Sequence, residues 1–331
     1  MLEHGGHLID ASKKYNIPLE QWTDLSTGIN PNGWPVPKIP EACWQRLPES
    51  ADGLLNAAKR YYQCQSILAV AGSQAAIQTL PLMRKKSKVG VLAPAYAEHA
   101  YSWQKAGHEV IELSADGLES ELATLDILIL INPNNPTGMQ FSKTQLLNWH
   151  RQLNRRNGWL IVDEAFIDTM PENSLSSHPA TEGLIILRSI GKFFGLAGIR
   201  CGFAIAAEDL LSELDERLGP WSISHPSRYI ATAALLDTQW QKKMQAELKK
   251  QSTRLAFLLK KRGLKVTAQT DLFLWARESN ATEIHQCLAQ KGILTRLFTK
   301  PSSLRFGLPK NESQWEHLDQ ALENMAANCI E

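Results

Sequence analysis

Short apolar runs alternate with helical patterns along the chain up to residue 205. We predict strands at 67–71, 89–93, 109–113, 126–131, 159–162 and 184–187, and helices at 53–64, 73–78, 97–107 and 142–156. The run 126–131 is apolar throughout after Asp126, which is typical of a strand covered on both faces. This alternation predicts an α/β fold with a mainly parallel, doubly wound sheet.

The pattern changes in the last third of the chain. We predict helices at 207–218, 227–236, 239–262, 281–291 and 312–328, and strands at 265–267, 272–276 and 303–307. This mixture is typical of a smaller α+β domain. The first 40 residues show little periodicity and are rich in glycine and proline. We therefore expect an N-terminal arm with a substrate loop over 1–40, a large domain over 41–222 and a small C-terminal domain over 223–331.

Composition excludes several classes of protein. With 44% hydrophobic and 21% charged residues the chain is ordinary and globular, and its net charge of +1 provides no reason to expect a nucleic-acid or membrane partner. No apolar run approaches the roughly 18 residues of a membrane span. The start of the chain shows no secretory signal, so we expect a cytoplasmic protein. The five cysteines form no Cys-x-x-Cys pair, so we expect neither disulfides nor a metal site, and we expect the ten tryptophans to be packing residues.

Residues with possible chemistry follow the predicted strands. They are Gly72-Ser73 after the first strand, Tyr96 after the second, Asn135 after 126–131, Asp163 after 159–162, and Ser189 and Lys192 after 184–187. Because open α/β sheets bind ligands at the carboxyl ends of their strands, we expect these residues to converge. No Gly-x-Gly-x-x-Gly follows a strand and no P-loop motif is present, which argues against dinucleotide and nucleoside-triphosphate binding.

The stretch 188–202 holds Lys192 among four glycines and two phenylalanines, with Arg200 close by. A lysine held among apolar groups beside another cation should lose affinity for its proton, as a Schiff-base amine requires. A surface loop with a solvated lysine is the alternative, and these fifteen residues do not decide between the two. Arg305 poses a similar choice, because it could be a strand surface charge or the fork that grips a carboxylate.

Taken together, the ordered set resembles the fold-type-I pyridoxal-phosphate (PLP) enzymes, in the branch of histidinol-phosphate aminotransferase. The residues that carry the resemblance are Gly72-Ser73, Tyr96, Asn135-Pro136-Thr137-Gly138, Asp163-Glu164-Ala165, Ser189-x-x-Lys192, Arg200 and Arg305. The likeness runs over nearly the whole chain. It implies PLP as the cofactor, a large domain with a mainly parallel sheet, and a homodimer.

The resemblance also implies a role for each residue. Lys192 would form a Schiff base with PLP and later carry a proton, and Asp163 would pair with the pyridine nitrogen. Asn135 would hydrogen-bond the phenolic oxygen of PLP. Tyr96 would stack on the ring and, with Lys192 and Asp163, make up the expected catalytic residues. Arg305 would grip the substrate carboxylate. The phosphate of PLP would be held by Gly72, Ser73, Ser189 and Arg200, with Gln74 beside them.

Two positions depart from the family pattern. Phe166 stands where relatives commonly have a tyrosine that bonds the phenolic oxygen, so that task would fall more on Asn135. Residues 46–49 read Arg-Leu-Pro-Glu in place of Arg-Tyr-Pro-Asp, which puts in doubt a contact that the tyrosine makes to the neighbouring subunit's cofactor.

The start of the chain narrows the resemblance. His4-Gly5-Gly6 and the run 26–31 are similar to the threonine-phosphate decarboxylase subfamily of cobalamin biosynthesis, as is the run 71–78. This implies decarboxylation of L-threonine O-3-phosphate to (R)-1-amino-2-propanol O-2-phosphate. An aminotransferase of the histidinol-phosphate type remains the alternative, because both reactions use the same central residues. The expected substrate-binding residues are Arg305, His4, Ser26, Gly28 and Asn30.

Overall fold

The computed structural model describes residues 4–328 and divides into two compact units. The described residues of the smaller unit come from Met1–Asn32, Pro136–Gly138 and Met244–Glu331, and those of the larger unit from Gly33–Asn135 and Met139–Lys243. The division therefore falls within helix α10 (Thr238–Lys261) and not at residue 222. Residues 223–243 join the larger unit because α9 (His225–Leu236) packs against α3 (Leu54–Tyr62).

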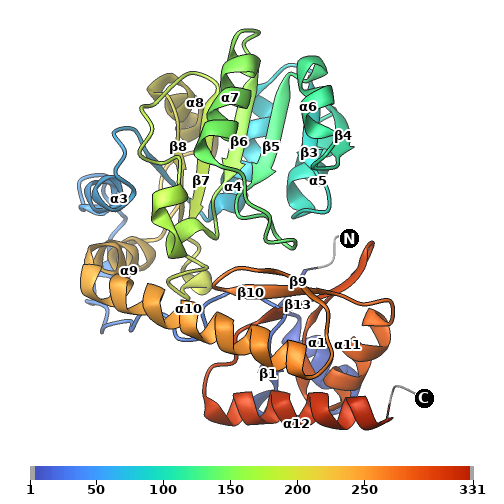
Figure 1. Cartoon of the computed structure of the whole chain (residues 1–331). Coiled ribbons are helices and arrows are strands. Elements are labelled where there is room, and N and C mark those ends of the chain that lie inside the picture. The colour runs from blue at the N-terminus through green and yellow to red at the C-terminus, as the bar shows by residue number, and fades with distance from the viewer. Residues whose placement is uncertain (1–3, 329–331) are drawn as a thin grey trace. The chain divides into compact units, whose positions relative to one another are not determined.

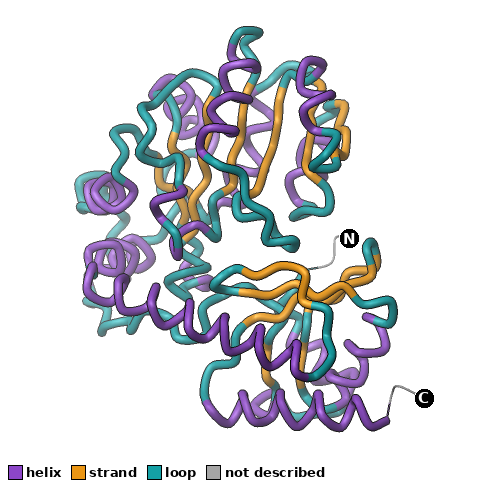
Figure 2. Tube along the Cα trace, viewed as in Figure 1, coloured by secondary structure: helices purple, strands orange, loops and turns teal. Residues whose placement is uncertain are grey.

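The larger unit is built on a seven-stranded sheet (Figures 1 and 2). Its strands, in spatial order, are β2 (Leu68–Val70), β8 (Gly202–Ile205), β7 (Leu184–Ser189), β6 (Trp159–Asp163), β5 (Ile127–Ile131), β3 (Lys88–Leu92) and β4 (Glu109–Leu113). Strand β8 pairs antiparallel with both of its neighbours, and the remaining pairs are parallel. The mainly parallel sheet that the sequence predicts is confirmed.

Helices cover both faces of this sheet. The helices of this unit, besides α3 and α9, are α2 (Ala42–Gln45), α4 (Ser73–Thr79), α5 (Glu98–Lys105), α6 (Leu118–Glu121), α7 (Lys143–Asn154) and α8 (Glu208–Leu218). Helices α4, α5 and α8 pack together on one face, and α7 lies on the other (Figure 1). Ser142 starts α7 with a capping box, in which its hydroxyl accepts from the Gln145 amide. The central strands are buried on both sides, as their apolar runs require: all five residues of β5 are buried.

The smaller unit combines two sheets with three helices of its own and most of α10. Its elements are α1 (Leu8–Tyr15), β1 (Thr23–Asp24), β9 (Val266–Gln269), β10 (Phe273–Arg277), α11 (Ala281–Gln290), β11 (Ile293–Leu294), β12 (Arg296–Thr299), β13 (Ser302–Gly307) and α12 (Glu312–Asn328). Strands β12, β13, β10 and β9 form an antiparallel sheet, and β1 pairs with β11.

Four elements of this unit were not predicted: α1, β1, β11 and β12, and β1, like β11, has only two residues. Helix α1 buries only Ala11 fully, against a small cluster that includes Trp22, so its apolar signal is weak. The two residues of β11 are too few to show a pattern. The packing role expected of the tryptophans is also too broad, because Trp44 and Trp221 are 65% and 60% exposed. Among residues 4–328, no helix is both long enough and apolar enough to cross a membrane.

Candidate active site

The predicted site residues of the larger unit gather at one edge of its sheet. Asp163 is the last residue of β6 and Ser189 the last of β7, and these strands are neighbours. Tyr96 follows β3 and Asn135 follows β5, so the same parallel edge carries both. Because β8 is antiparallel, its first residue, Gly202, also lies at this edge, opposite Ser189. Tyr96 and Gly202, which are 106 positions apart in the chain, are therefore brought to the same edge by strand order alone.

Asp163 is buried, and two donors hold its carboxylate. The Nε2 atom of His99, on α5, lies 2.9 Å from one oxygen, and the amide of Ala165 donates to the other at 3.0 Å. His99 is only 1% exposed. A buried carboxylate needs such partners, and the orientation of Asp163 is set by them. Sequence reasoning missed His99, because nothing in the local pattern of the helix distinguishes it from a packing residue.

Tyr96 is held at its hydroxyl. The hydroxyl donates to the side-chain oxygen of Gln74 at 3.2 Å, and the Gln74 amide nitrogen donates to Glu98 at 2.8 Å. Burial, with Glu98 and Asp163 nearby, raises the pKa of Tyr96 to about 12. The ring of Tyr96 also lies 6.3 Å from that of His99, edge to face. Gln74 therefore fixes the tyrosine, which stays protonated through the physiological range.

Two glycines, Gly72 and Gly202, lie where β2 and β8 meet, and neither position has room for a side chain. A Cβ atom at Gly72 would lie 2.7 Å from the Arg200 guanidinium, and one at Gly202 would lie 2.6 Å from the Ser73 amide nitrogen. The Gly72 amide donates to the carbonyl of Val70, so Gly72 offers no free amide, and its missing side chain leaves room for the Arg200 guanidinium. The amides of Ser73 and the residue after it begin α4, ahead of the helix's own hydrogen bonds.

The Lys192 loop is anchored by aromatic side chains. Phe193 and Phe194 are fully buried, and Phe194 stacks on Trp240 with ring centroids 5.6 Å apart. The ammonium group of Lys192 lies 5.3 Å from the centre of the Phe166 ring. Phe166 thus offers this lysine an apolar face where the family pattern has a tyrosine hydroxyl.

Asn135 lies in a turn that follows β5 and is fixed by two other asparagines. Asn132 bonds both backbone groups of Phe141 with its side chain, and Asn134 donates to the carbonyl of Pro94 at 2.9 Å. These two asparagines are buried and fix the turn, whereas Asn135 is half-buried at its tip.

A second cluster of predicted residues lies in the smaller unit around Arg305. Arg305 is buried and donates to the carbonyl of Ser26 at 2.6 Å, so the interpretation as a surface charge is wrong. Arg296 lies directly opposite Arg305 across strands β12 and β13 and donates to the carbonyl of His4 at 3.3 Å. Burial lowers the pKa of Arg305 to about 10, and Arg296 acts in the same direction. Like charges directly opposite each other destabilise a sheet, so this pair favours an anion as ligand.

Residues 4–6 contact this cluster. The Gly6 amide donates to the Ser26 hydroxyl at 2.8 Å, and a Cβ atom at Gly5 would lie 2.3 Å from the Ser26 carbonyl oxygen. Gly28 and Asn30 are buried nearby in the chain, and the Asn30 side chain accepts from the Asn32 amide at 2.9 Å. Sequence reasoning selected these residues but missed Arg296, which lies in a strand that was not predicted.

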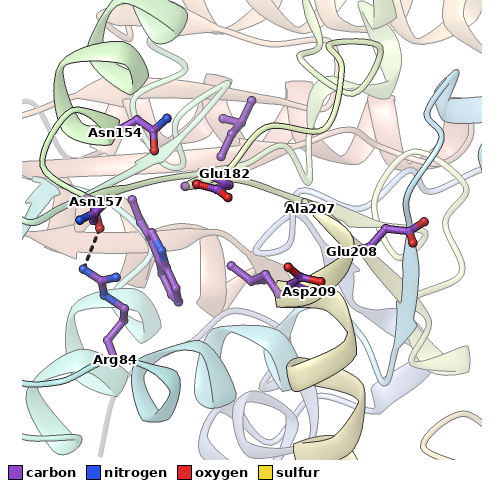
Figure 3. Close-up of a pocket in the computed structure, with 12 residues that line it drawn as sticks. Arg84, Asn154, Asn157, Glu182, Ala207, Glu208 and Asp209 are labelled. Carbon is purple, nitrogen blue, oxygen red and sulfur yellow. Dashed lines mark hydrogen bonds between the residues drawn. The ribbon is translucent and has the colours of Figure 1, made fainter.

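A cavity of about 440 Å³ lies at the opposite edge of the larger sheet (Figure 3). Trp159 and Leu184, the first residues of β6 and β7, help to line it. Arg84 lies 4.8 Å from the centre of the Trp159 ring and donates to the carbonyl of Asn157. None of the predicted site residues is among those that line this cavity, so we assign it no part in the chemistry.

Comparison with known proteins shows the family of this chain. The family model described as aminotransferase class I and II matches residues 48–322. The chain belongs to this family. It is 51% identical over 322 residues to the threonine-phosphate decarboxylase of Pseudomonas aeruginosa, a match that covers 97% of each chain. It is 37% identical to the threonine-phosphate decarboxylase of a Sinorhizobium species, over 97% of this chain and 98% of the relative.

A solved structure extends the likeness to the whole fold. The histidinol-phosphate aminotransferase from Sinorhizobium meliloti, in complex with pyridoxal-5'-phosphate, superposes with a TM-score of 0.85. The match covers 98% of this chain and 95% of that one at 18% identity, so it bears on the fold alone.

Proposed function

We propose that this aminotransferase-family protein is a PLP-dependent threonine-phosphate decarboxylase. It would convert L-threonine O-3-phosphate to (R)-1-amino-2-propanol O-2-phosphate and carbon dioxide, a reaction of cobalamin biosynthesis. The observation that carries the proposal is the 51% identity to a threonine-phosphate decarboxylase over 97% of both chains.

The residues at the sheet edge fit PLP. The cofactor presents an aldehyde, a pyridine nitrogen, a flat ring and a phosphate. Lys192 offers an amine, Asp163 a carboxylate in a fixed orientation, and Tyr96 an aromatic face. For the phosphate, Ser73, Gln74, Ser189 and Arg200 offer amides, a hydroxyl and a guanidinium. A side chain at Gly72 or Gly202 would collide with the Arg200 guanidinium or the Ser73 amide, so the two glycines allow these groups to stay in place. Asn135 would bond the phenolic oxygen.

The arginine pair fits the two anionic groups of the substrate. Arg305 would bind the carboxylate, as the family pattern implies, and Arg296 would bind the phosphate. A bound anion would also relieve the repulsion between the two guanidinium groups. His4, Ser26, Gly28 and Asn30 would shape the surrounding surface, since His4 and Gly6 already hydrogen-bond with Arg296 and Ser26.

The chain's own residues would direct the chemistry. Bound PLP supplies an electron sink for the electrons of a bond at the substrate's α-carbon. Arg305 would hold the carboxylate so that the C–COO⁻ bond is the one that breaks. Asp163 would keep a proton on the pyridine nitrogen, and His99 would hold Asp163. Lys192 would deliver a proton to the α-carbon after carbon dioxide leaves.

We also propose a homodimer in the cytoplasm. Trp44 and Leu47 are 65% and 61% exposed beside α9, where Tyr229 is 37% exposed, and we name these three residues the α2–α9 patch. Large apolar side chains grouped at a surface favour an interface.

One assay separates decarboxylation from transamination. The protein with PLP is incubated with L-threonine O-3-phosphate, and carbon dioxide is followed with and without 2-oxoglutarate. A decarboxylase releases carbon dioxide at the same rate with and without 2-oxoglutarate. Turnover that depends wholly on the keto acid would instead identify an aminotransferase.

A further inference from the structure

A group of buried charged side chains lies next to the strand ends that carry Asp163 and Ser189. Arg188 precedes Ser189, and Glu164 follows Asp163. One nitrogen of Arg188 donates to Glu164 at 2.9 Å and the other to Asp168 at 2.5 Å. Arg188 is 2% exposed, and the two carboxylates are fully buried. We name these residues, with Ser174 and Tyr61, the Arg188 cluster.

One guanidinium faces two carboxylates in this cluster, so neutral donors must stabilise the remaining negative charge. The Ser174 hydroxyl and the Leu175 amide donate to Glu164. The Tyr61 hydroxyl donates to Asp168 at 3.0 Å. Burial raises the pKa of both carboxyl groups, although Arg188 acts in the opposite direction. Each donor is therefore needed, because a buried carboxylate with too few partners is costly.

Tyr61 has a second contact, with the Lys192 loop. Its ring lies edge to face with that of Phe194, at a centroid distance of 5.5 Å. Phe194 is fully buried, and its carbonyl accepts from the Trp34 amide at 2.8 Å. Tyr61 therefore touches the Arg188 cluster with its hydroxyl and the lysine loop with its ring. It belongs to α3, far in sequence from the Lys192 loop.

We propose that Tyr61 is a positioning residue for Lys192, which it holds in register with Asp163 by joining the Arg188 cluster to Phe194. The inference rests on the proposed role of Lys192 as the amine that binds PLP. At the end of β6, Glu164 of the cluster follows Asp163, and at the end of β7, Arg188 precedes Ser189. A shift of Asp168 would move Arg188 and, one residue further, Ser189 and the loop that follows.

Helix α3 provides a matched control. Tyr62, the next residue, is buried, whereas Tyr61 is half-buried, and the Tyr62 ring lies 4.5 Å from the Arg188 guanidinium. Its hydroxyl has no hydrogen-bond partner among the residues that the structure describes. Tyr61→Phe and Tyr62→Phe each remove one hydroxyl from the same helix, but only Tyr61→Phe removes a hydrogen bond of the cluster.

Three measurements test the proposal. Hydrogen exchange of the segment 189–196, without PLP, should be about tenfold faster in Tyr61→Phe than in the wild type. The visible circular dichroism of bound PLP should fall, because the cofactor is less firmly oriented. The kcat should drop about tenfold with KM within twofold. Asp168→Asn should give the same three changes, and Tyr62→Phe none.

The proposal is overturned if Tyr61→Phe matches the wild type in exchange and dichroism. It is also overturned if exchange rises equally over the whole larger unit, since Tyr61 would then only stabilise the fold. Exchange and dichroism do not depend on which reaction is catalysed, so they test Tyr61 even if the decarboxylation assay fails. Visible dichroism that survives in Lys192→Ala would overturn the role of Lys192, and this inference with it.

Discussion

The Nε2 atom of His99 lies 2.9 Å from a carboxylate oxygen of Asp163, and both side chains are buried. The second oxygen of Asp163 accepts from a backbone amide two residues on. With both oxygens engaged, the carboxylate has one orientation, and the His99 ring is part of what maintains it.

Replacing His99 by Phe should weaken PLP binding about 10- to 100-fold, because a buried carboxylate that loses a donor costs about 1–3 kcal/mol. Titration of the apoprotein with PLP measures the effect. His99→Gln, which keeps an N–H donor, should recover part of the affinity. His150 is a buried histidine bonded to the Glu182 carbonyl at the other edge of the sheet, so His150→Phe is the control. Equal affinities in His99→Phe and His150→Phe would refute the assignment.

Lys192→Ala should abolish the visible absorbance of the PLP-loaded protein, because the band arises when the lysine amine is bonded to the cofactor aldehyde. Lys88→Ala removes a lysine at the opposite end of β3 and should leave the band unchanged. Absorbance that persists in Lys192→Ala after dialysis would mean that another amine holds the cofactor.

The contrast between Asp163 and His99 shows what the sequence could predict. Asp163 and Lys192 each come after an apolar run, so local pattern was enough to predict their place at one edge of the sheet, whereas the role of Lys192 came from the family resemblance. His99 becomes a site residue only when α5 packs across the end of β6. Arg296 becomes the neighbour of Arg305 only when β12 pairs with β13. Contacts of this kind depend on packing and register between distant segments, which no local periodicity reports.

Arg296→Gln should raise the KM for L-threonine O-3-phosphate about 10- to 100-fold, because a hydrogen bond between charged groups contributes about 1.5–3 kcal/mol. The kcat should change much less. The thermal unfolding midpoint should change little, because removing a like charge opposite Arg305 offsets the loss of the hydrogen bond to the His4 carbonyl. Arg277→Gln, at an exposed end of the same sheet, should leave KM unchanged. An unaltered KM in Arg296→Gln would exclude a phosphate contact.

The pair Asp52–Arg228 should make stability depend on pH. Burial would raise the pKa of Asp52, but the hydrogen bonds from Arg228 and Leu54 outweigh it, and the pKa lies below the ordinary 3.8. Because the folded pKa is the lower one, the pair stabilises the fold above pH 3.8 and loses that contribution as pH falls through the folded value. Asp52→Asn should lower the free energy of unfolding by about 1–3 kcal/mol at pH 7 and by less at pH 3.

Urea denaturation at both pH values measures the difference. Glu49→Gln breaks an exposed pair with Arg46 and should change stability little at either pH. A destabilisation of Asp52→Asn that is the same at pH 7 and pH 3 would show that the charge of Asp52 does not carry the effect.

The α2–α9 patch should be where two copies of the chain meet. Trp44→Glu places a charge in the middle of exposed apolar side chains, and a buried interface would tolerate it poorly: loss of one central aromatic residue raises the dimer Kd about 30-fold or more. Sedimentation velocity across a dilution series should show monomers of Trp44→Glu at concentrations where the wild type is a dimer. Phe257→Glu introduces the same charge at a side chain of α10 that is 71% exposed and outside the patch, so it should remain dimeric. If Trp44→Glu sediments as the wild type does, the interface lies on another face.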